Sequence, residues 1–471
     1  MNLRLGVFIV CFMLVAELLV GCDTLVYTDE ILSESNCYNT RSLCEDEDFD
    51  VHLLAVKRFV ELSYPCQSYR IQPLAVDTDT LLFVCNFDDG WIVVSGDKRT
   101  SPVLAEDSVG QLNLKDAPDG LFVWLDSIAE DVWYLKRDAP KIINKNVEFW
   151  DLIFCPISQY IPTKSGRSFK WYVVDSSPVV STTGYSFVPH LISTKWGQGS
   201  PWNSKCPIDT KVNKRCYLGC VATAVAQMLI YTHTFLSKPN RLYHNISCSK
   251  TTVYGNSYNI GFSRSNLVEN STRWLSMPID STGVSTSIAY AGDLMLDIGN
   301  RFGMYYSGSG SGADISSSAM LNYYDLSYTY GDYNMIDVAD NVGNDLPVII
   351  SAYSERGFLG IGYSRGHEWL IDGIYLSTTS YTYTKSFVYS EDWAGHSEVY
   401  DTFEEIQAIY GVQYPSDTVE RTVSINTTYW LMNWGYNGNY DSGHYGMAVT
   451  DEWNANGGSH QYNRKIYYDF S

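Results

Sequence analysis

A glycine–cysteine step, Gly219-Cys220, leads directly into a run of small and apolar residues at 221–228. This composition predicts a helix that begins at the cysteine. The unpaired amides of a helix N-terminus favour an anion, and the thiolate is the nucleophilic form of cysteine. Gly219 leaves the preceding backbone uncrowded, so a substrate could approach closely. Cys220 is therefore a candidate nucleophile. The alternative is a buried cysteine that opens a core helix, because free cysteines are usually buried.

A thiol nucleophile needs a partner that titrates near neutral pH, and histidine is that side chain. His367 follows Gly366 at the start of an expected strand. His233 lies at the far end of the nucleophile's own helix, too remote to reach back, and His52 falls in the front part of the chain. The remaining histidines lie in polar or irregular sequence: His190, His244, His396, His444 and His460. His367 is the candidate base, and its alternative is a hydrogen-bonded core histidine.

The elements that must position these residues can be read from periodicity. Apolar residues at helical spacing predict helices at 49–64, 120–135, 220–232 and 285–303. Alternating or continuous apolar runs predict strands at 81–87, 90–97, 347–353, 367–374 and 429–434, the first two joined as a hairpin by Asp-Asp-Gly. Helices followed by strands over 188–471 favour an α+β domain, with a helix-rich lobe packed on a sheet lobe and a cleft between them.

Four further segments occur in a fixed order around the cysteine and the histidine. They are TKWGQG at 194–199, PWN at 201–203, GHEWLIDG at 366–373 and NWGYNG at 433–438. Together with Gly219-Cys220 they resemble the streptopain family, the secreted papain-like cysteine proteases of bacteria, over roughly residues 188–446. The resemblance implies a papain-like two-lobed α+β fold with a helical lobe and an antiparallel sheet lobe. It also implies a cysteine endopeptidase that acts through an acyl-enzyme.

The front part carries a second, weaker resemblance to the same family. The segments VSGDKR at 94–99 and PVLA at 102–105 are similar to its propeptide. An α+β propeptide domain is therefore expected, and the resemblance implies that it blocks the cleft as an inhibitor and guides folding. The chain would then be a zymogen whose partners are protein or peptide substrates and its own propeptide.

The resemblance also implies roles for individual residues. His367 matches the family's catalytic histidine, and the Gln198 side chain would hold the oxyanion with the Cys220 backbone amide. Papain-like enzymes of animals and plants have Asn-Ser-Trp-Gly, whereas Asn433 here directly precedes Trp434. Adjacent strand residues face opposite sides, so we favour Trp434 over Asn433 as the group that positions His367. By resemblance alone, Ser311 and Gly366 would contact the substrate. The alternative for the Gly-Ser stretch around Ser311 is a flexible connection.

Composition and charge limit the other partners. With 53 acidic and 32 basic residues the net charge is -21, which argues against nucleic acid and against an anionic membrane surface. No Cys-x-x-Cys pairs occur and the eight histidines are scattered, so we expect no structural zinc and no cofactor. Setting aside Cys11 and Cys22 leaves nine cysteines, and an odd number outside the cytosol leaves one thiol unpaired. Cys206 and Cys216 could pair, although sequence does not fix connectivity.

The domain organisation predicted from these features has four parts. Residues 1–22 read as a lipoprotein signal peptide, with Arg4, an apolar stretch at 5–20 and a lipid-accepting thiol at Cys22. An ordinary cleaved signal peptide is the alternative. A propeptide domain at 23–170, a linker with the activation cleavage at 171–187 and a protease domain at 188–471 follow, because the polar Ser-, Thr- and Pro-containing stretch at 161–186 is typical of nicked segments.

The predicted function is a secreted or surface-anchored bacterial cysteine endopeptidase, located outside the cytoplasm and anchored to the membrane by its N-terminal lipid or released after processing. Two alternatives stay open. A cell-wall peptide amidase or transferase would use the same two residues on a different acyl group. A non-catalytic surface adhesin on a protease fold would need neither thiolate nor imidazole, and the 37 tyrosines are compatible with a binding surface.

Overall fold

The computed structural model describes residues 49–138, 144–154, 169–176, 178–234, 246–253, 256–262, 274–353, 359, 366–391, 398–447 and 464–471. Within these ranges no helix is both long enough and apolar enough to cross a membrane. The expected export signal and the lipid acceptor Cys22 lie outside the described residues and stay predictions from the sequence.

The front of the chain forms a four-stranded antiparallel meander flanked by helices. Its strands are β1 (Tyr69–Val76), β2 (Asp79–Phe87), β3 (Trp91–Ser95) and β4 (Val103–Asp107). Its helices are α2 (Leu53–Ser63), α3 (Asp119–Asp138) and α4 (Lys145–Phe154). The two expected helices and the expected hairpin are all present. Strands β2 and β3 are buried almost continuously and are rich in β-branched and aromatic residues, which explains why that hairpin was readable from the sequence.

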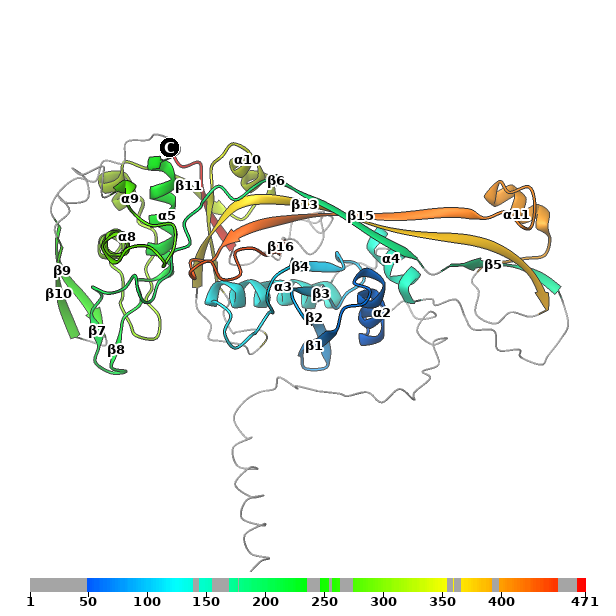
Figure 1. The fold of residues 1–471 in the computed structure, drawn as a ribbon, viewed down its shortest axis with the longest axis horizontal. Helices are drawn as coiled ribbons and strands as arrows, with labels where there is room; N and C mark the ends of the chain where they lie inside the picture. Colours follow the sequence, from blue (N-terminus) through cyan, green and yellow to red (C-terminus); the bar gives the residue numbers. More distant parts are fainter. Residues whose placement is uncertain are drawn as a thin grey trace, which may run out of the picture.

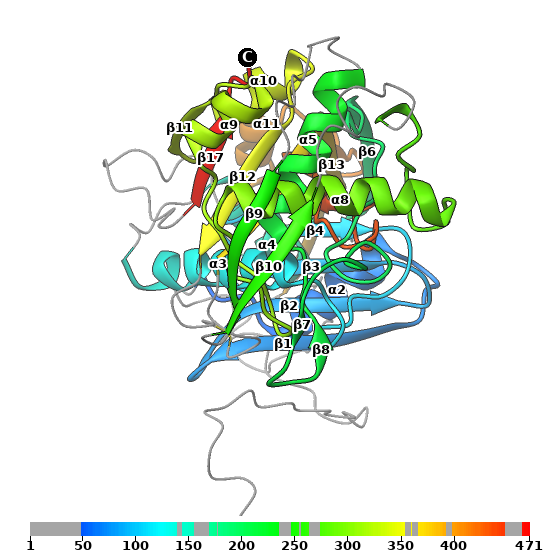
Figure 2. The same ribbon diagram turned by 90° about the vertical axis from the view of Figure 1, so that its left-hand side faces the viewer.

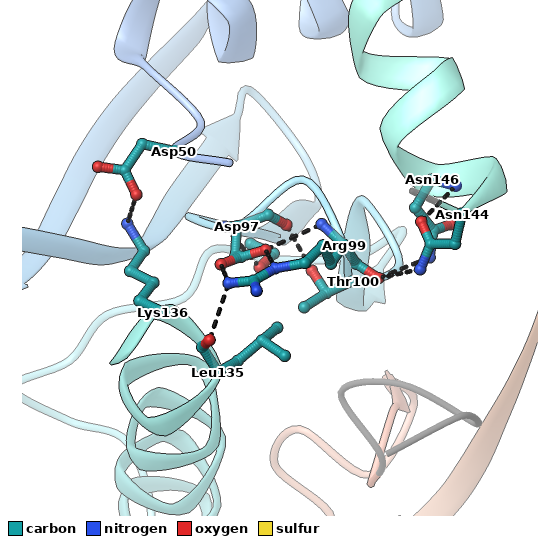
Figure 3. Close-up of polar contacts among 9 residues, drawn as sticks. Asp50, Asp97, Arg99, Thr100, Leu135, Lys136, Asn144 and Asn146 are labelled. Atoms are coloured by element: carbon teal, nitrogen blue, oxygen red, sulfur yellow. Dashed lines mark hydrogen bonds and ion pairs between the residues drawn. The ribbon is translucent and has the colours of Figure 1, made fainter. Parts of the chain in front are cut away.

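A buried ion pair at the end of this hairpin ties the front elements together (Figure 3). Arg99 donates from Nε to Asp97 Oδ1 at 2.9 Å and from Nη2 to Asp97 Oδ2 at 2.7 Å. Arg99 also donates to the Leu135 carbonyl at the end of α3, and its own carbonyl accepts from Asn144 and Asn146 at the start of α4. The pair therefore fixes α3 and α4 against the meander.

A large antiparallel sheet runs through the molecule. Its order is β1-β2-β3-β4-β16-β15-β13-β12-β17-β11. The strands not yet given are β11 (Thr329–Asp332), β12 (Val348–Tyr353), β13 (Gly366–Glu391), β15 (Val419–Asn433), β16 (His444–Tyr445) and β17 (Arg464–Tyr468). The front meander joins through β4 and β16, where Ala105 pairs with Tyr445 and Glu106 with His444.

Two further strands occupy much of the stretch expected to be an irregular linker. They are β5 (Phe169–Asp175) and β6 (Val179–Val188), and both pair with β13. Their sequences, FKWYVVD and VVSTTGYSFV, are rich in β-branched and aromatic residues, which suit a strand. Most of β6 is exposed, so its residues show no apolar face that would have marked it as a strand. Only the short break around 176–178 separates the two strands.

The helical lobe packs against one side of this sheet (Figures 1 and 2). It contains the helices α5 (Cys220–Thr234), α8 (Ser285–Arg301) and α9 (Ser317–Tyr324). It also contains two small hairpins. One pairs β7 (Ile208–Asp209) with β8 (Lys214–Arg215), and the other pairs β9 (Ile246–Val253) with β10 (Asn256–Phe262). Helix α10 (Met335–Gly343) contacts β12, β13 and β17. A helical lobe on an antiparallel sheet confirms the predicted α+β class.

The strands β13 and β15 are longer than the sequence patterns predicted and form an arm. Their far ends extend past α2 and α4 in Figure 1, with α11 (Phe403–Tyr410) and β14 (Val399–Tyr400) beside them. Val173, Phe387 and Ile406 form a separate small core at this end. The expected strand at 367–374 is therefore only the first part of β13.

Candidate functional site

The nucleophile segment has the local structure expected from its sequence. Helix α5 begins at Cys220, and the Thr223 amide donates to the Gly219 carbonyl in its first turn. Gly219 has a φ of +93°, and a methyl group placed there would lie 2.6 Å from the Met304 methyl carbon. Only glycine suits both the backbone angle and the space. Cys220 is 7% exposed, so its sulfur lies at a buried helix N-terminus.

The Cys220 thiol bonds to a carboxylate in this structure. Cys220 Sγ donates to Glu368 Oε2 at 3.1 Å, and Ser351 Oγ donates to Glu368 Oε1 at 3.1 Å. Burial raises the pKa of the Cys220 thiol well above its usual value, and the negative charge of Glu368 raises it further. The sulfur is therefore held as a neutral thiol despite the helix N-terminus.

His367 lies beneath the front domain instead of beside the thiol. It is 4% exposed, its ring stacks on Trp369 with centroids 6.2 Å apart, and it hydrogen bonds with the Trp434 backbone. A methyl group placed on Gly120, at the start of α3, would lie 2.6 Å from His367 Cδ2. Its Nε2 atom is buried and has no hydrogen-bond partner among the described residues. Burial lowers the pKa of His367, and the charge of Asp119 on α3 opposes that shift.

Strand alternation explains this arrangement. Consecutive residues of β13 face opposite sides of the sheet. Trp369 belongs to the core shared with α3, whereas Leu370 belongs to the core that contains Cys220. His367 lies on the Trp369 side and Glu368 on the Leu370 side, so Glu368 meets the thiol. The structure therefore does not join the two residues predicted to act together.

Gln198 and Trp434 lie near the residues they were predicted to assist. The Leu218 amide donates to the Gln198 carbonyl at 2.9 Å, which places Gln198 beside the segment that leads into Cys220. Its side chain is half-buried. Trp434 is fully buried and stacks near Trp369, with centroids 5.2 Å apart. A methyl group on Gly120 would also lie 2.9 Å from Trp434 Cε3, so Trp434 and His367 line the same contact with α3.

Asn433 faces away from His367. Its amide nitrogen donates to the Thr194 carbonyl at 2.8 Å and to Gln227 Oε1 at 3.2 Å, and its oxygen accepts from Gln227 Nε2 at 3.0 Å and from the Gly435 amide. Gln227 lies on α5, so Asn433 ties β15 to the nucleophile's helix. Trp434 therefore lies beside His367 and Asn433 does not, and the role of Trp434 in positioning the imidazole stays a prediction.

Of the two predicted substrate contacts, Ser311 lies close to the nucleophile segment. Ser311 Oγ donates to the Tyr217 carbonyl at 2.7 Å and accepts from the Ser307 amide at 2.9 Å. The Ser311 carbonyl oxygen would lie 3.2 Å from a methyl group on Gly219. Ser311 therefore shapes the loop over Gly219 through its own bonds, a structural role that a flexible connection would not have. Gly366 is exposed at the start of β13, opposite Tyr353 of β12.

A network of two buried aspartates and the partly exposed His190 lies behind Trp434 and was missed by the sequence reasoning. His190 Nδ1 lies 2.8 Å from Asp372 Oδ1, and His190 Nε2 lies 3.0 Å from the Asp441 carbonyl. Asp441 Oδ1 accepts from the Trp434 amide at 3.0 Å. Burial raises the pKa of Asp441 to about 7, and the neighbouring Asp372 charge adds to that rise. Three residues so far apart in sequence carry no common motif, so only their fold brings them together.

Five cysteines are free thiols in the structure: Cys66, Cys85, Cys206, Cys216 and Cys220. Cys206 and Cys216 flank the β7–β8 hairpin, both are buried, and the charge of Cys216 contributes to the raised pKa of Cys206. The two residues considered as a possible pair therefore lie near each other. In the part of the chain that is described, no cluster of three or more His, Cys, Asp or Glu residues could hold a metal ion.

Comparison with known proteins identifies the relatives of this chain. A model of the Peptidase C10 family matches residues 196–445. The thiol protease/hemagglutinin PrtT of Porphyromonas gingivalis is 28% identical over 153 residues, which make up 32% of this chain and 15% of PrtT. The alignment thus spans less than a sixth of that relative's length.

Two solved structures are also similar. A cysteine-to-alanine variant of a prointerpain A fragment from Prevotella intermedia is 19% identical with a TM-score of 0.47, over 85% of this chain and 98% of that one. Active wild-type interpain A from Prevotella intermedia is 20% identical with a TM-score of 0.36, over 59% of this chain and 93% of that one. The family model covers Gln198, Cys220, His367 and Trp434 and more than half of the 471 residues. As the resemblance to the streptopain family predicted, this chain belongs to the Peptidase C10 family.

Proposed function

We propose that this protein is an endopeptidase made as a zymogen, with Cys220 as its nucleophile. The observation that carries the proposal is the position of Cys220 at the N-terminus of α5, after a glycine whose φ of +93° other residues rarely adopt, within the segment matched by the Peptidase C10 model. The family is one of cysteine peptidases, so the substrates proposed here are proteins or peptides.

The proposed chemistry proceeds in two steps. The Cys220 thiolate adds to the carbonyl carbon of a peptide bond, and the oxyanion accepts hydrogen bonds from the Cys220 amide and the Gln198 side chain. The His367 imidazolium gives its proton to the leaving amine, which leaves an acyl-enzyme. Water then attacks the thioester as His367 takes its proton, and the thiol is restored. Trp434 covers and positions the imidazole.

We further propose that the described form is the latent one. The thiol bonds to Glu368, and the start of α3 lies against His367. Three of the contacts that hold the front domain to the rest of the chain come from α3. Trp124 Nε1 donates to the Gly446 carbonyl at 2.8 Å, the Leu359 amide donates to Asp126 at 2.9 Å, and Arg464 pairs with Asp131 at 2.8 Å. Removal of this domain, by cleavage within 171–187, would free His367 to meet Cys220.

The direct test replaces the proposed nucleophile. Purified Cys220→Ala should not mature itself, and its rate of casein cleavage should fall by about 10³-fold or more, because covalent catalysis is lost. N-terminal sequencing of both proteins after incubation would report activity and the cleavage position together. Cys66→Ala is the matched control, since Cys66 is an exposed free thiol and should be dispensable. Casein cleavage by Cys220→Ala at the wild-type rate would refute the proposal.

A further inference from the structure

The proposed nucleophile is hydrogen bonded to the carboxylate of Glu368. The sulfur lies 3.1 Å from Oε2, and the other carboxylate oxygen accepts from Ser351 at the same distance. Ser351 stands opposite Glu368 in the β12–β13 register. The Cys220 thiol and the Ser351 hydroxyl each donate a hydrogen, and the Glu368 carboxylate accepts both bonds. The pairing of β12 with β13 therefore positions the Glu368 carboxylate against the Cys220 sulfur.

Among the described residues, no cationic side chain pairs with the negative charge of the Glu368 carboxylate. Within the described chain, Glu368 makes no ion pair with a lysine, arginine or histidine. The titratable groups that face it are Cys220 from α5, Asp314 from the loop before α9, and Tyr467 from β17. His367 is its sequence neighbour but faces the other side of β13. Burial raises the pKa of Glu368 to about 7, and the Asp314 charge acts in the same direction.

We propose that Glu368 is a positioning residue that holds Cys220 as a protonated thiol in the latent form, and that Glu368 must leave the sulfur before His367 can act on it. This inference rests on the function proposed above. A carboxylate beside a sulfur makes a second negative charge unfavourable, so it opposes the thiolate that the α5 N-terminus favours. A protease nucleophile needs the opposite neighbour, an imidazolium. Glu368 therefore acts against the reaction for as long as it touches the sulfur.

The proton in this contact belongs to sulfur. Moving it to the carboxylate would leave a thiolate and a carboxylic acid, but the pKa of Glu368 is about 7 whereas that of the Cys220 thiol is raised well above its usual value. The transfer is therefore uphill, and Glu368 cannot serve as the base that activates Cys220. Because alternation prevents residues 367 and 368 from facing the sulfur together, His367 can reach Cys220 only where Glu368 has left.

The test measures the reactivity of one thiol and does not depend on proteolysis. The full-length chain carries His367→Ala so that it does not process itself, and iodoacetamide labelling of the Cys220 peptide is followed by mass spectrometry from pH 6 to 11. Glu368→Gln keeps the shape and the hydrogen-bonding capacity but removes the charge. It should lower the pH midpoint of Cys220 labelling by at least about one unit, equivalent to about tenfold faster labelling below the midpoint.

A matched control separates this contact from a general loss of charge. Asp314→Asn removes a carboxylate that faces Glu368 without a bond to the sulfur, and should move the midpoint by less than about 0.3 unit. Access to the sulfur changes the maximal labelling rate but leaves the midpoint in place, so the midpoint reports the thiolate alone. A midpoint in Glu368→Gln within about 0.3 unit of the parent would overturn the proposal.

Glu368→Ala keeps the proposal testable if Glu368→Gln does not fold. It removes the carboxylate together with its charge, so the midpoint of Cys220 labelling should fall in the same direction. An unchanged midpoint in folded Glu368→Ala would count against the proposal. If casein cleavage survives Cys220→Ala but the Glu368→Gln shift is seen, the proposed function fails while the carboxylate contact stands.

Discussion

At the scale of single residues, the segment Asn433-Trp434 connects three parts of the site. Asn433 bonds to Gln227 of α5, and Trp434 lies against His367 and α3. The Trp434 amide donates to Asp441, whose carbonyl meets His190. The position of Trp434, and hence the neighbour of His367, therefore depends on a buried carboxylate that titrates near neutrality.

The raised pKa of Asp441 predicts a pH dependence of stability. Between the ordinary aspartate pKa of about 4 and about 7, the folded protein keeps a proton on Asp441 that the unfolded chain has released. The contribution is therefore fully favourable below this window and is lost as pH rises through it. Asp441→Asn keeps an oxygen for the Trp434 amide but cannot ionise. In wild type the unfolding free energy should decrease as pH rises through this window. In Asp441→Asn the slope of that decrease should be smaller by up to about 1.4 kcal/mol per pH unit.

Urea unfolding of the full chain at several pH values between 4.5 and 7 would measure this effect. Glu368 contributes with the same sign, because its pKa is also raised to about 7, so a smaller slope should persist in Asp441→Asn. Equal slopes for Asp441→Asn and wild type would show that the carboxyl at 441 is ionised in the folded protein throughout this range.

At the scale of elements, the sequence predicted best where one local pattern suffices. Helix α5 has a small apolar run after glycine, α3 has apolar residues at helical spacing, and β2 and β3 are joined by a turn signal. The order of Gln198, Cys220, His367 and Trp434 was likewise readable, because a family's motifs keep their order along the chain. The structure places Gln198 beside the segment that leads into Cys220, and it places His367 and Trp434 together against α3 on the other side of β13.

What the sequence could not predict depends on pairing between distant strands. β13 was expected over 367–374 but continues to Glu391, since a Ser-, Thr- and Tyr-rich stretch with two similar faces shows no alternation. Glu368 stands beside the predicted histidine and was passed over, because which face of β13 meets α5 is set by the packing of the lobes. Strand β6 was overlooked because most of its residues are exposed and show no apolar face, and β5 because its two buried residues are adjacent and show no alternation.

The Arg99–Asp97 pair gives a prediction at this scale (Figure 3). Both side chains are buried, so Arg99→Ala would leave the Asp97 carboxylate without its charge partner and remove the link to Leu135 at the end of α3. The unfolding free energy of the front domain should fall by about 3–5 kcal/mol. Arg137→Ala is the matched control, because Arg137 is 45% exposed and pairs at 3.4 Å with Asp79. Its loss should cost about 1 kcal/mol or less, and similar effects of the two changes in urea unfolding would contradict the role given to Arg99.

At the scale of the whole molecule, one sheet serves both the front domain and the protease-family region. The bridge is short, since only two residue pairs join β4 to β16. The hydrophobic core on the α3 side adds to this connection. It contains residues of β2, β3 and α3 together with Trp369, Trp434 and Ile466, so the two parts of the chain share one core. The front domain is thus built into the same core that holds His367, which explains how α3 can bury a residue of the site so completely.

The arm formed by β13 and β15 is organised differently. Its end has its own small core, in which Ile406 of α11 packs on Val173 of β5 and Phe387 of β13. None of these three residues belongs to the larger cores around α5 and α3. A region with few buried contacts of its own should open separately from the rest of the protein. The site and the tip of the arm are therefore expected to differ in local stability.

Ile406→Ala tests this separation. Ile406 is fully buried, so truncation to alanine should cost about 2–5 kcal/mol at the tip of the arm. Hydrogen exchange should accelerate in α11 and in the ends of β5 and β13 that pair there, while amides of α5 and β12 keep their wild-type rates. Ile409→Ala on the same helix is the matched control, because Ile409 is 57% exposed and its truncation leaves no cavity. Faster exchange in α5 of Ile406→Ala would mean that the arm and the site unfold as one unit, since the loss of a side chain at the tip would then have reached the helix that carries Cys220.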